Sequence, residues 1–233
     1  MYKRLCIWLF GMLTALMVQA QQVSPVAVYI DDEGNQQETT SIDDGQAPLS
    51  VEFRANPSDM GDYTPRFYWH FQRMVQGSGW QNLFVRNDEE NTQYTFNESG
   101  TYRVMLKTYL EKDGNTDELD SVTISVTIVD SKLEMPNAFS PNGDGINDVY
   151  KAKEGYKSIV DFHAYIFNRW GQKLFEWTDI STGWDGTFNG HEVKDGVYFV
   201  LVKARGGDGR EYNIKRDVNL LRGFTEKSGT TGN

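Results

Sequence analysis

The chain has 233 residues, and its 33 acidic side chains against 23 lysines and arginines give a formal net charge of −10. This acidic balance excludes a protein that tracks nucleic-acid phosphates, since such a protein needs a basic face. With 39% apolar and 13% aromatic residues, the chain is also too apolar to be a disordered acidic segment. Its length is sufficient for two domains, each with its own core.

Residues 1–20 have the pattern of a secretory signal peptide, because two basic residues precede a mainly apolar run that ends in small residues. Cleavage is expected between Ala20 and Gln21. The alternative, a transmembrane anchor, needs a longer apolar run of about 20 residues. Cys6 is the only cysteine and lies within this run. We therefore expect no disulfide and no thiolate metal site in the exported protein.

Short runs of alternating apolar and polar residues predict antiparallel strands between residues 21 and 130. The predicted strands cover residues 26–30, 51–55, 67–71, 80–85, 94–96, 102–106 and 122–128. About seven strands over about 100 residues are typical of an immunoglobulin-like sandwich. We expect residues 21–45 to provide an N-terminal strand and an acidic loop, residues 46–130 to form the sandwich, and Trp69 to lie in its core.

A second domain is predicted at residues 136–223, after a linker at residues 131–135. Its predicted strands cover residues 161–167, 172–177, 197–203 and 212–221. Turns that contain glycine separate these strands, as tight hairpins require. Residues 224–233 are polar and are predicted to form a flexible tail. The predicted fold class is therefore all-β, with two immunoglobulin-like sandwiches in tandem after a cleaved signal peptide.

The negative charge is confined to the first of these domains. Residues 21–138 carry 20 acidic and 8 basic side chains, a net charge of −12, whereas residues 139–222 carry 12 of each. The acidic clusters at residues 31–33, 43–44, 88–90 and 117–120 fall in predicted loops. Solvated loop tips explain them, and divalent-cation sites are the alternative.

Residues 46–129 resemble a PKD domain, an immunoglobulin-like module of bacterial surface proteins. The matching segments are Gly45-Gln46-Ala47-Pro48-Leu49, Phe67-Tyr68-Trp69-His70-Phe71, Tyr94-Thr95-Phe96 and Ser99-Gly100-Thr101-Tyr102-Arg103-Val104. Where the family usually has a Trp-x-Phe-Gly-Asp-Gly turn, this chain has Trp69-His70-Phe71-Gln72-Arg73. The resemblance therefore covers the strands rather than that turn.

Five blocks in the second domain have a more specific pattern, and the last of them is Val218-Asn219-Leu220-Leu221-Arg222. The residues of the first four blocks are Asn137, Phe139, Ser140, Pro141, Asn142, Gly143, Asp144, Gly145, Asn147 and Asp148, then Phe167, Asn168, Arg169, Trp170 and Gly171, then Trp184, Asp185 and Gly186, then Asp195, Gly196 and Tyr198. Together the blocks resemble the gliding-motility-associated C-terminal domain. That domain is the type B sorting domain of the type IX secretion system of Bacteroidota.

The resemblance implies an export address. Such domains carry a passenger from the periplasm across the outer membrane and leave it outside the cell or attached to its surface. The partners implied are the type IX secretion machinery and a PorP/SprF-like outer-membrane β-barrel. Residues 223–233 extend beyond the point where the family pattern usually ends. Within the blocks, we expect Trp170 and Trp184 to pack beside turns, and Arg169 is our candidate for recognition by the machinery.

The loop at residues 142–148 has oxygen-bearing side chains at alternate positions, which makes Asn142, Asp144 and Asp148 a calcium candidate. An EF-hand needs a glycine at its sixth position and a glutamate at its twelfth, and those places hold Asn147 and Lys153. A turn whose side chains cap its own backbone is therefore the favoured interpretation.

No catalytic or cofactor-binding pattern stands out. His70, His163 and His191 lie far apart in the sequence, and neither a nucleophile elbow nor a phosphate-binding loop occurs. We expect a non-catalytic surface protein without a cofactor, in which the PKD-like domain serves as an adhesion, spacer or protein-interaction module. One alternative is a carbohydrate-binding module that uses aromatic residues such as Trp80 and Tyr63. The other is an accessory subunit of the gliding or secretion apparatus, paired with the PorP/SprF-like protein.

Overall fold

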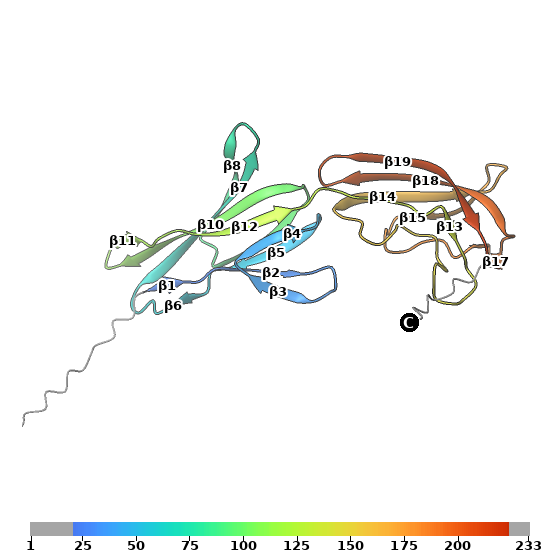
Figure 1. Ribbon diagram of the computed structural model, residues 1–233. Helices are drawn as coiled ribbons and strands as arrows, with labels where there is room; N and C mark the ends of the chain where they lie inside the picture. Colours follow the sequence, from blue (N-terminus) through green and yellow to red (C-terminus); the bar gives the residue numbers. More distant parts are fainter. Residues whose placement is uncertain (1–20, 224–233) are drawn as a thin grey trace, which may run out of the picture.

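The computed structural model describes residues 21–223, which form two β domains placed end to end (Figure 1). The described residues contain strands and turns but no helix, so the predicted all-β fold class is confirmed. Accordingly, the described part of the chain has no helix that could cross a membrane. The predicted signal peptide, including Ala20, and the predicted tail at residues 224–233 lie outside the described residues.

The first domain consists of two sheets that share one core. One sheet has the strand order β3 (Gln36–Thr39), β2 (Val26–Ile30), β5 (Leu49–Arg54) and β9 (Asn91–Phe96). The other has the order β4 (Ser41–Gly45), β12 (Val122–Ile128), β10 (Gly100–Lys112), β7 (Thr64–Val75) and β8 (Gly79–Asn87), with β11 (Asn115–Glu118) paired to β10. A short ribbon joins β1 (Gln22–Val23) to β6 (Pro57–Ser58). All pairs are antiparallel except β4 with β12. Because the two sheets share one core, the domain is a sandwich as predicted.

Alternating residues of the facing strands fill the first core. Trp69 is fully buried between the sheets, as predicted, and its ring centroid lies 5.9 Å from that of Phe53 on the opposite sheet. The Phe53 ring also meets Phe71 edge-on at 5.5 Å. Successive side chains of a strand point to opposite faces of the sheet. The apolar residues at every second position of the sequence therefore lie on the same face, which is the buried one.

Two acidic segments that were expected to be loops form strands instead. Asp43 and Asp44 lie in β4, where Ile42 and Gly45 supply the only buried positions. Asp117 lies in β11, whose four residues are all exposed and which extends the hairpin from β10. Backbone pairing along a sheet edge is sufficient to hold such segments, so their side chains carry no apolar alternation.

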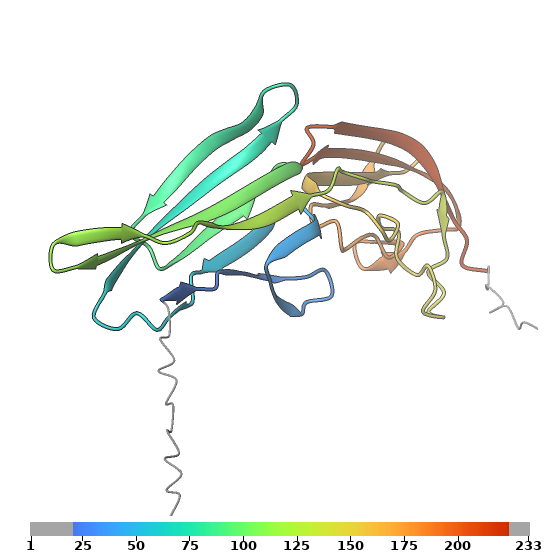
Figure 2. The same cartoon turned by 60° about the vertical axis from the view of Figure 1, so that its left-hand side comes forward.

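The second domain is built on one five-stranded sheet. Its strand order is β13 (Ala138–Phe139), β19 (Glu211–Leu220), β18 (Gly196–Gly206), β14 (Ile159–Phe167) and β15 (Lys173–Trp177). A ribbon of β16 (Thr187–Phe188) and β17 (His191–Glu192), together with irregular segments, forms the opposite layer (Figure 2). Tyr150 and Trp184 come from those segments and pack in the same core as Ile166 and Val200 of the sheet.

The second core begins inside the segment that was expected to be a linker. Leu133 and Met135 are buried in this core, whereas Lys132, before Leu133, and Glu134, between the two, are exposed. Lys132 also exchanges two backbone hydrogen bonds with Lys157. The segment therefore behaves as an extended, half-buried strand, which its own alternation of apolar and charged residues explains.

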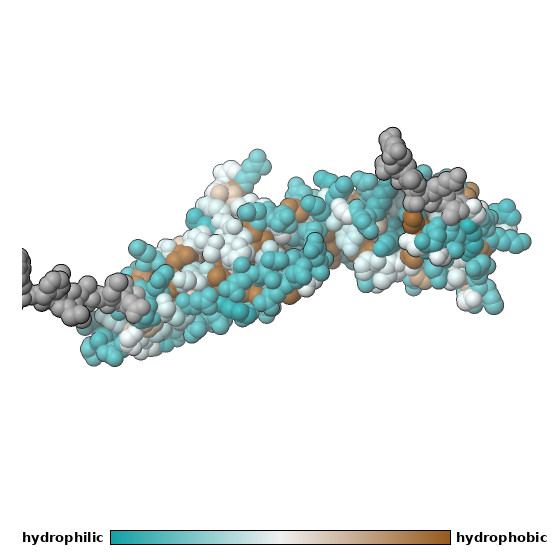
Figure 3. All heavy atoms as spheres, turned by 60° about the horizontal axis from the view of Figure 1, so that its bottom comes forward, coloured by the Kyte–Doolittle hydropathy of each residue, from teal (hydrophilic) through white to brown (hydrophobic). Residues whose placement is uncertain are grey.

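The face of the molecule drawn in Figure 3 is mainly polar. On this face, apolar residues are scattered singly across both domains. Scattered exposed apolar residues are normal for a folded protein, so only a local concentration of them calls for an explanation.

Candidate functional site

Three motif blocks of the second domain meet in one aromatic cluster. Trp184 and Tyr150 are fully buried, and the ring of Phe139 lies 5.4 Å from Trp184 and 5.7 Å from Tyr150. Tyr198 of β18 meets Trp184 edge-on at 5.1 Å. Residues about 60 positions apart in the sequence thus form one packing unit, and Trp184 packs beside its turn as predicted.

The polar ends of these aromatic side chains all have partners. The indole N–H of Trp184 donates to the carbonyl of Thr187 at 2.7 Å, and the hydroxyl of Tyr198 donates to the carbonyl of Lys194 at 2.6 Å. Burial raises the pKa of the Tyr198 hydroxyl above its ordinary value, which keeps it a donor. A buried N–H or O–H without a partner is costly, so these bonds fix the turn that follows Trp184 and the turn that precedes Tyr198.

Arg222 closes the cluster from the end of β19. Its guanidinium donates to the carbonyls of Gly186 and Val193, and its backbone N–H donates to the Asp195 carboxylate at 3.0 Å. Gly186 has a φ of +80°, and a Cβ there would lie 3.0 Å from Pro141 and 3.1 Å from Arg222. Arg222 thus acts as a structural clamp between three blocks. The sequence placed Arg222 at the end of a predicted strand, but no sequence signal predicted its hydrogen-bond partners.

The loop at residues 142–148 caps its own backbone. The Asp148 carboxylate accepts hydrogen bonds from the N–H groups of Asn142, Gly143 and Gly145 at 2.9, 2.7 and 2.8 Å. The Asn142 side chain accepts from Asp144 N–H at 2.9 Å. Among the described residues, no group of three His, Cys, Asp or Glu side chains is placed to hold a metal ion. The arrangement is that of the self-capping turn favoured from the sequence.

The Asp148 carboxylate gives this loop a pH dependence. Hydrogen bonds from Gly143, Gly145 and Asn142 hold its pKa below the ordinary value of 3.8. A lowered pKa in the folded state means that the stabilisation is present above the unfolded value and is lost as pH falls through the folded value. We expect the NMR signals of the Gly143 and Gly145 amides to titrate with a midpoint below 3.8. The titration should vanish in Asp148→Asn, and a midpoint at or above 3.8 would contradict the capping role.

The remaining motif residues mainly support turns and strand pairing. Ser140 is buried, and the Asn137 carbonyl accepts the Asn219 N–H at 2.9 Å, which pairs β13 with β19. The Asp185 carboxylate accepts the Thr187 N–H at 2.9 Å. Asn147 and Gly196 have positive φ values of 53° and 149°. The fold therefore explains why these residue types occur at these motif positions, and no ligand is needed to explain them.

One block faces solvent. The Asn168 side chain accepts the N–H groups of Trp170 and Gln172 at 3.0 and 3.1 Å, and this closes the turn between β14 and β15. Trp170 is 75% exposed, so the expectation that it packs beside the turn was wrong. Because Asn168 closes the turn, the Trp170 ring is not needed for packing and projects outward with the Arg169 guanidinium 4.3 Å from its centroid.

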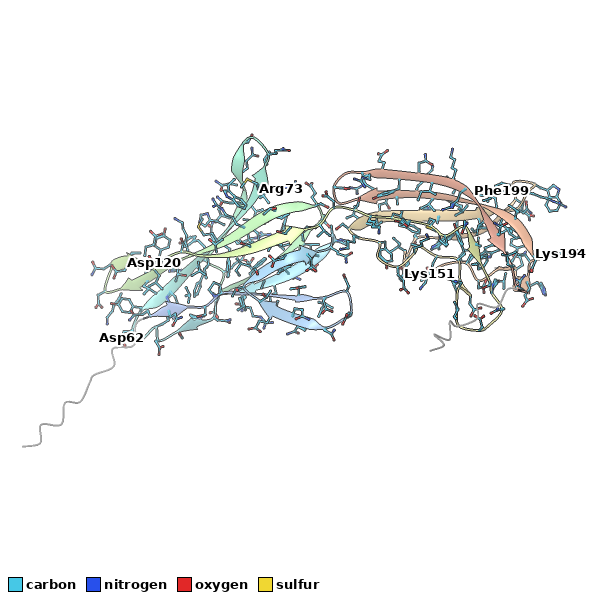
Figure 4. All side chains as sticks on the ribbon, in the orientation of Figure 1. Asp62, Arg73, Asp120, Lys151, Lys194 and Phe199 are labelled. Carbon is cyan, nitrogen blue, oxygen red and sulfur yellow. The ribbon has the colours of Figure 1, made fainter. Side chains whose placement is uncertain are left out.

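Beside this turn lies a hollow of about 560 Å³. It is lined by Arg169, Trp170, Leu174, Phe188, Lys194 and Val197, among others. Val197 is 48% exposed and Phe199, also at its edge, is 45% exposed. Figure 4 shows Phe199 and Lys194 at the end of the second domain that lies away from the first domain. We call this hollow, with the turn at residues 168–171, the distal surface.

The distal surface combines an apolar lining with positive charge. Asp195 contributes the acidic group of the lining, and its carboxylate is paired with Arg222 at 3.3 Å. Neither Arg169 nor Lys194 forms an ion pair with any residue that the structure describes. Exposed aromatic rings beside unpaired cations are suited to an apolar partner that carries acidic groups.

The aromatic residues singled out in the first domain are less available. The guanidinium of Arg103 lies 4.4 Å from the Trp80 ring centroid, and the ammonium of Lys112 lies 5.1 Å from that of Tyr63. Both rings are half-buried, whereas Trp170 is 75% exposed. The structure does not bring these two rings together with the motif residues of the second domain.

The second domain also matches a known family. Residues 133–216 match the family described as the CHU_C type IX secretion signal domain. The match begins at Leu133, the residue at which the second core begins. No match was found among curated proteins.

Among solved structures, the chain is similar to dimeric latent PorU from Porphyromonas gingivalis, with 12% identity and a TM-score of 0.26. That alignment covers 86% of this chain and 20% of PorU, so the chain spans about a fifth of the length of that relative. A tetra-tandem repeat in the extending region of a large adhesion protein has 12% identity and a TM-score of 0.27, with coverage of 87% and 68%. The FN1–FN3 domains of chicken CNTN1 have 10% identity and a TM-score of 0.23, with coverage of 83% and 76%.

Proposed function

Because residues 133–216 form a type IX secretion signal domain, we propose that this chain is a non-catalytic protein that this domain exports to the cell surface or the medium. The family match, which covers all of the second core except Val218 and Leu220, is the observation that carries the proposal. The PKD-like first domain then serves as an adhesion, spacer or protein-interaction module of a Bacteroidota surface protein.

The distal surface is our proposal for the part that the export machinery recognises. Most motif residues are buried or engaged in turns, so a partner meets few of them directly. Trp170 and Arg169 project into solvent, whereas the exposed side chains of Asn142 and Asp144 cap their own turn. The hollow beside Trp170 and Arg169 offers an apolar contact area. Tryptophan and arginine are also the residues that most often dominate binding energy at protein interfaces.

A PorP/SprF-like outer-membrane β-barrel is the partner that the sequence resemblance implies. The distal surface supports this proposal through its unpaired cations and exposed aromatic rings, which suit a protein partner with acidic groups. An accessory role in the gliding or secretion apparatus follows if that pairing persists after export. The glycan-binding alternative has less support, since Trp80 and Tyr63 are half-buried.

Deletion of residues 133–233 tests the proposal. In a host with a working type IX system, the full chain is expected in the medium or on the cell surface, and the truncated chain is expected to stay in the periplasm. The full chain in a secretion-deficient host provides the control for leakage. Undiminished export of the truncated chain would refute the proposal.

A point variant tests the distal surface itself. Arg169→Ala combined with Trp170→Ala is expected to leave stability within about 0.5 kcal/mol of the original, because both side chains are exposed. Its binding to the machinery should weaken by about 2 kcal/mol, roughly 30-fold, if these residues are interface hot spots. Ile30→Ala is the matched control, since it also removes an exposed apolar side chain but in the first domain. Equal export of the two variants would exclude the distal surface as the recognised site.

A further inference from the structure

The end of the second domain opposite the distal surface is hydrogen-bonded to the first domain through the backbone. The Ser99 N–H of the first domain donates to the Gly207 carbonyl of the second at 2.9 Å, and within the second domain the Gly207 N–H donates to the Ser158 carbonyl at 2.8 Å. The Ser158 hydroxyl accepts the Ala47 N–H at 3.2 Å and donates to the Val129 carbonyl at 2.6 Å. The turn between β18 and β19 therefore reaches across the domain boundary (Figure 2).

Buried polar residues are concentrated at this joint. Ser99, Ser131 and Ser158 are 5%, 5% and 2% exposed, and they are three of the six buried polar residues in the described chain. The Ser131 hydroxyl donates to the Asp208 carboxylate at 2.7 Å, and it lies 2.9 Å from the Tyr212 hydroxyl. Burying hydroxyl groups costs free energy unless they are hydrogen-bonded, and each of these three has its partner at the joint.

The joint also requires a backbone without side chains. A Cβ on Gly207 would lie 2.9 Å from the Ala47 Cβ and 3.0 Å from the Ser99 hydroxyl oxygen. A Cβ on Gly206 would overlap the Ser131 side chain. Neither glycine has a positive φ, so close approach rather than turn geometry explains both of them.

Apolar contact continues across the same boundary. Val160 lies in β14 of the second domain, but it packs against the core of the first domain. The backbone bonds, the buried hydroxyls and this contact all involve residues at one end of each domain. Neighbouring domains normally move relative to one another unless the interface between them is strong. The hydrogen bonds, buried hydroxyl groups and apolar contact described above strengthen this interface.

We infer that the end of the second domain formed by Ser158, Gly206, Gly207 and Asp208 is a docking surface for the domain that precedes it, so that the two domains form one stiff unit. Its occupant is the part of the first domain that presents Ala47 and Ser99, small residues whose N–H groups reach it. The segment at residues 130–135 is then not a hinge, and the distal surface has a fixed direction relative to the first domain. The inference stands independently of export, because it is tested on the purified protein.

The test compares two glycine-to-valine variants of residues 21–233 by NMR relaxation and small-angle scattering. In the original chain, both domains should tumble with one common correlation time. Gly207→Val should give each domain a shorter correlation time of its own and broaden the distribution of molecular dimensions. Gly223→Val is the matched control, since its Cβ meets nothing within 4 Å, and it should leave both measurements unchanged. Separate correlation times in the original chain would overturn the inference, as would a stiff Gly207→Val variant.

A second variant separates loosening from failure to fold. Ser158→Ala removes the hydroxyl that joins Ala47 to Val129 and adds no atoms, so both domains should keep their own cores. Amide exchange of Ala47 and Ser99, whose N–H groups donate to the second domain, should accelerate by about tenfold or more, while amides in the centres of β10 and β18 stay protected. Unchanged exchange at Ala47 and Ser99 would mean that these bonds do not hold the joint, and the inference would fail.

Discussion

Replacing Trp184 with alanine is expected to lower the free energy of unfolding of the second domain by about 3–5 kcal/mol. The side chain is fully buried, and its ring contacts those of Phe139 and Tyr198. The change leaves a cavity and removes the donor to the Thr187 carbonyl. Since a domain is stable by about 5–15 kcal/mol, the loss takes a large share of the total. Urea unfolding followed by signals of β18 residues measures it.

Trp170→Ala is the matched control, because it removes the same side chain from an exposed position in the same domain. Its stability should stay within about 0.5 kcal/mol of the original. Trp184→Ala should therefore lose much of its stability and be exported less, whereas Trp170→Ala should keep its stability. A loss below about 1 kcal/mol for Trp184→Ala would contradict its place at the centre of the cluster.

Replacing Trp69 with alanine should destabilise the first domain by a similar amount, about 3–5 kcal/mol. Trp69 is fully buried against Phe53, and its indole N–H donates to the Glu89 carbonyl at 2.9 Å. The lost hydrogen bond also leaves that carbonyl, which precedes β9, without this donor. Hydrogen exchange of amides in β10 reports the loss, because these amides open with the first core.

The control for this variant is Trp80→Ala, at a half-buried tryptophan whose contact with Arg103 contributes about 0.5–1 kcal/mol. In Trp69→Ala the amides of β18 should keep most of their protection, because their core does not contain this residue. Equal loss of protection in both domains would show that neither folds without the other. Equal stability of the two tryptophan variants would contradict the position of Trp69 in the core.

The strand positions were predictable wherever one face of a strand is buried. Alternation around Val51, Trp69 and Val104 becomes the first core directly, because a period of two places every second side chain on the same face. The edge strands β3, β4 and β11 escaped prediction, since their pairing depends on backbone groups and not on side chains. Acidic residues such as Asp43 in β4 therefore look like loop residues in the sequence.

The candidate site was only partly predictable for a related reason. Trp170 and Trp184 both lie beside a glycine turn, yet one is exposed and the other is buried. The difference comes from which segment lies opposite, and the sequence around each tryptophan does not contain that information. The role of Gly206 and Gly207 was also not predictable. The sequence predicts a hairpin turn there, but the close approach of Ala47 depends on how the two domains pack together.

The two ends of the described chain lie at opposite poles of the molecule, which matters for protein engineering. Residue 21 adjoins the β1–β6 ribbon in the first domain, whereas β19 ends beside the distal surface (Figure 1). Figure 4 places Asp62 and Asp120 near the first pole and Lys194 near the second. A cargo fused ahead of Gln21 therefore joins the molecule at the pole remote from both the domain joint and the hollow.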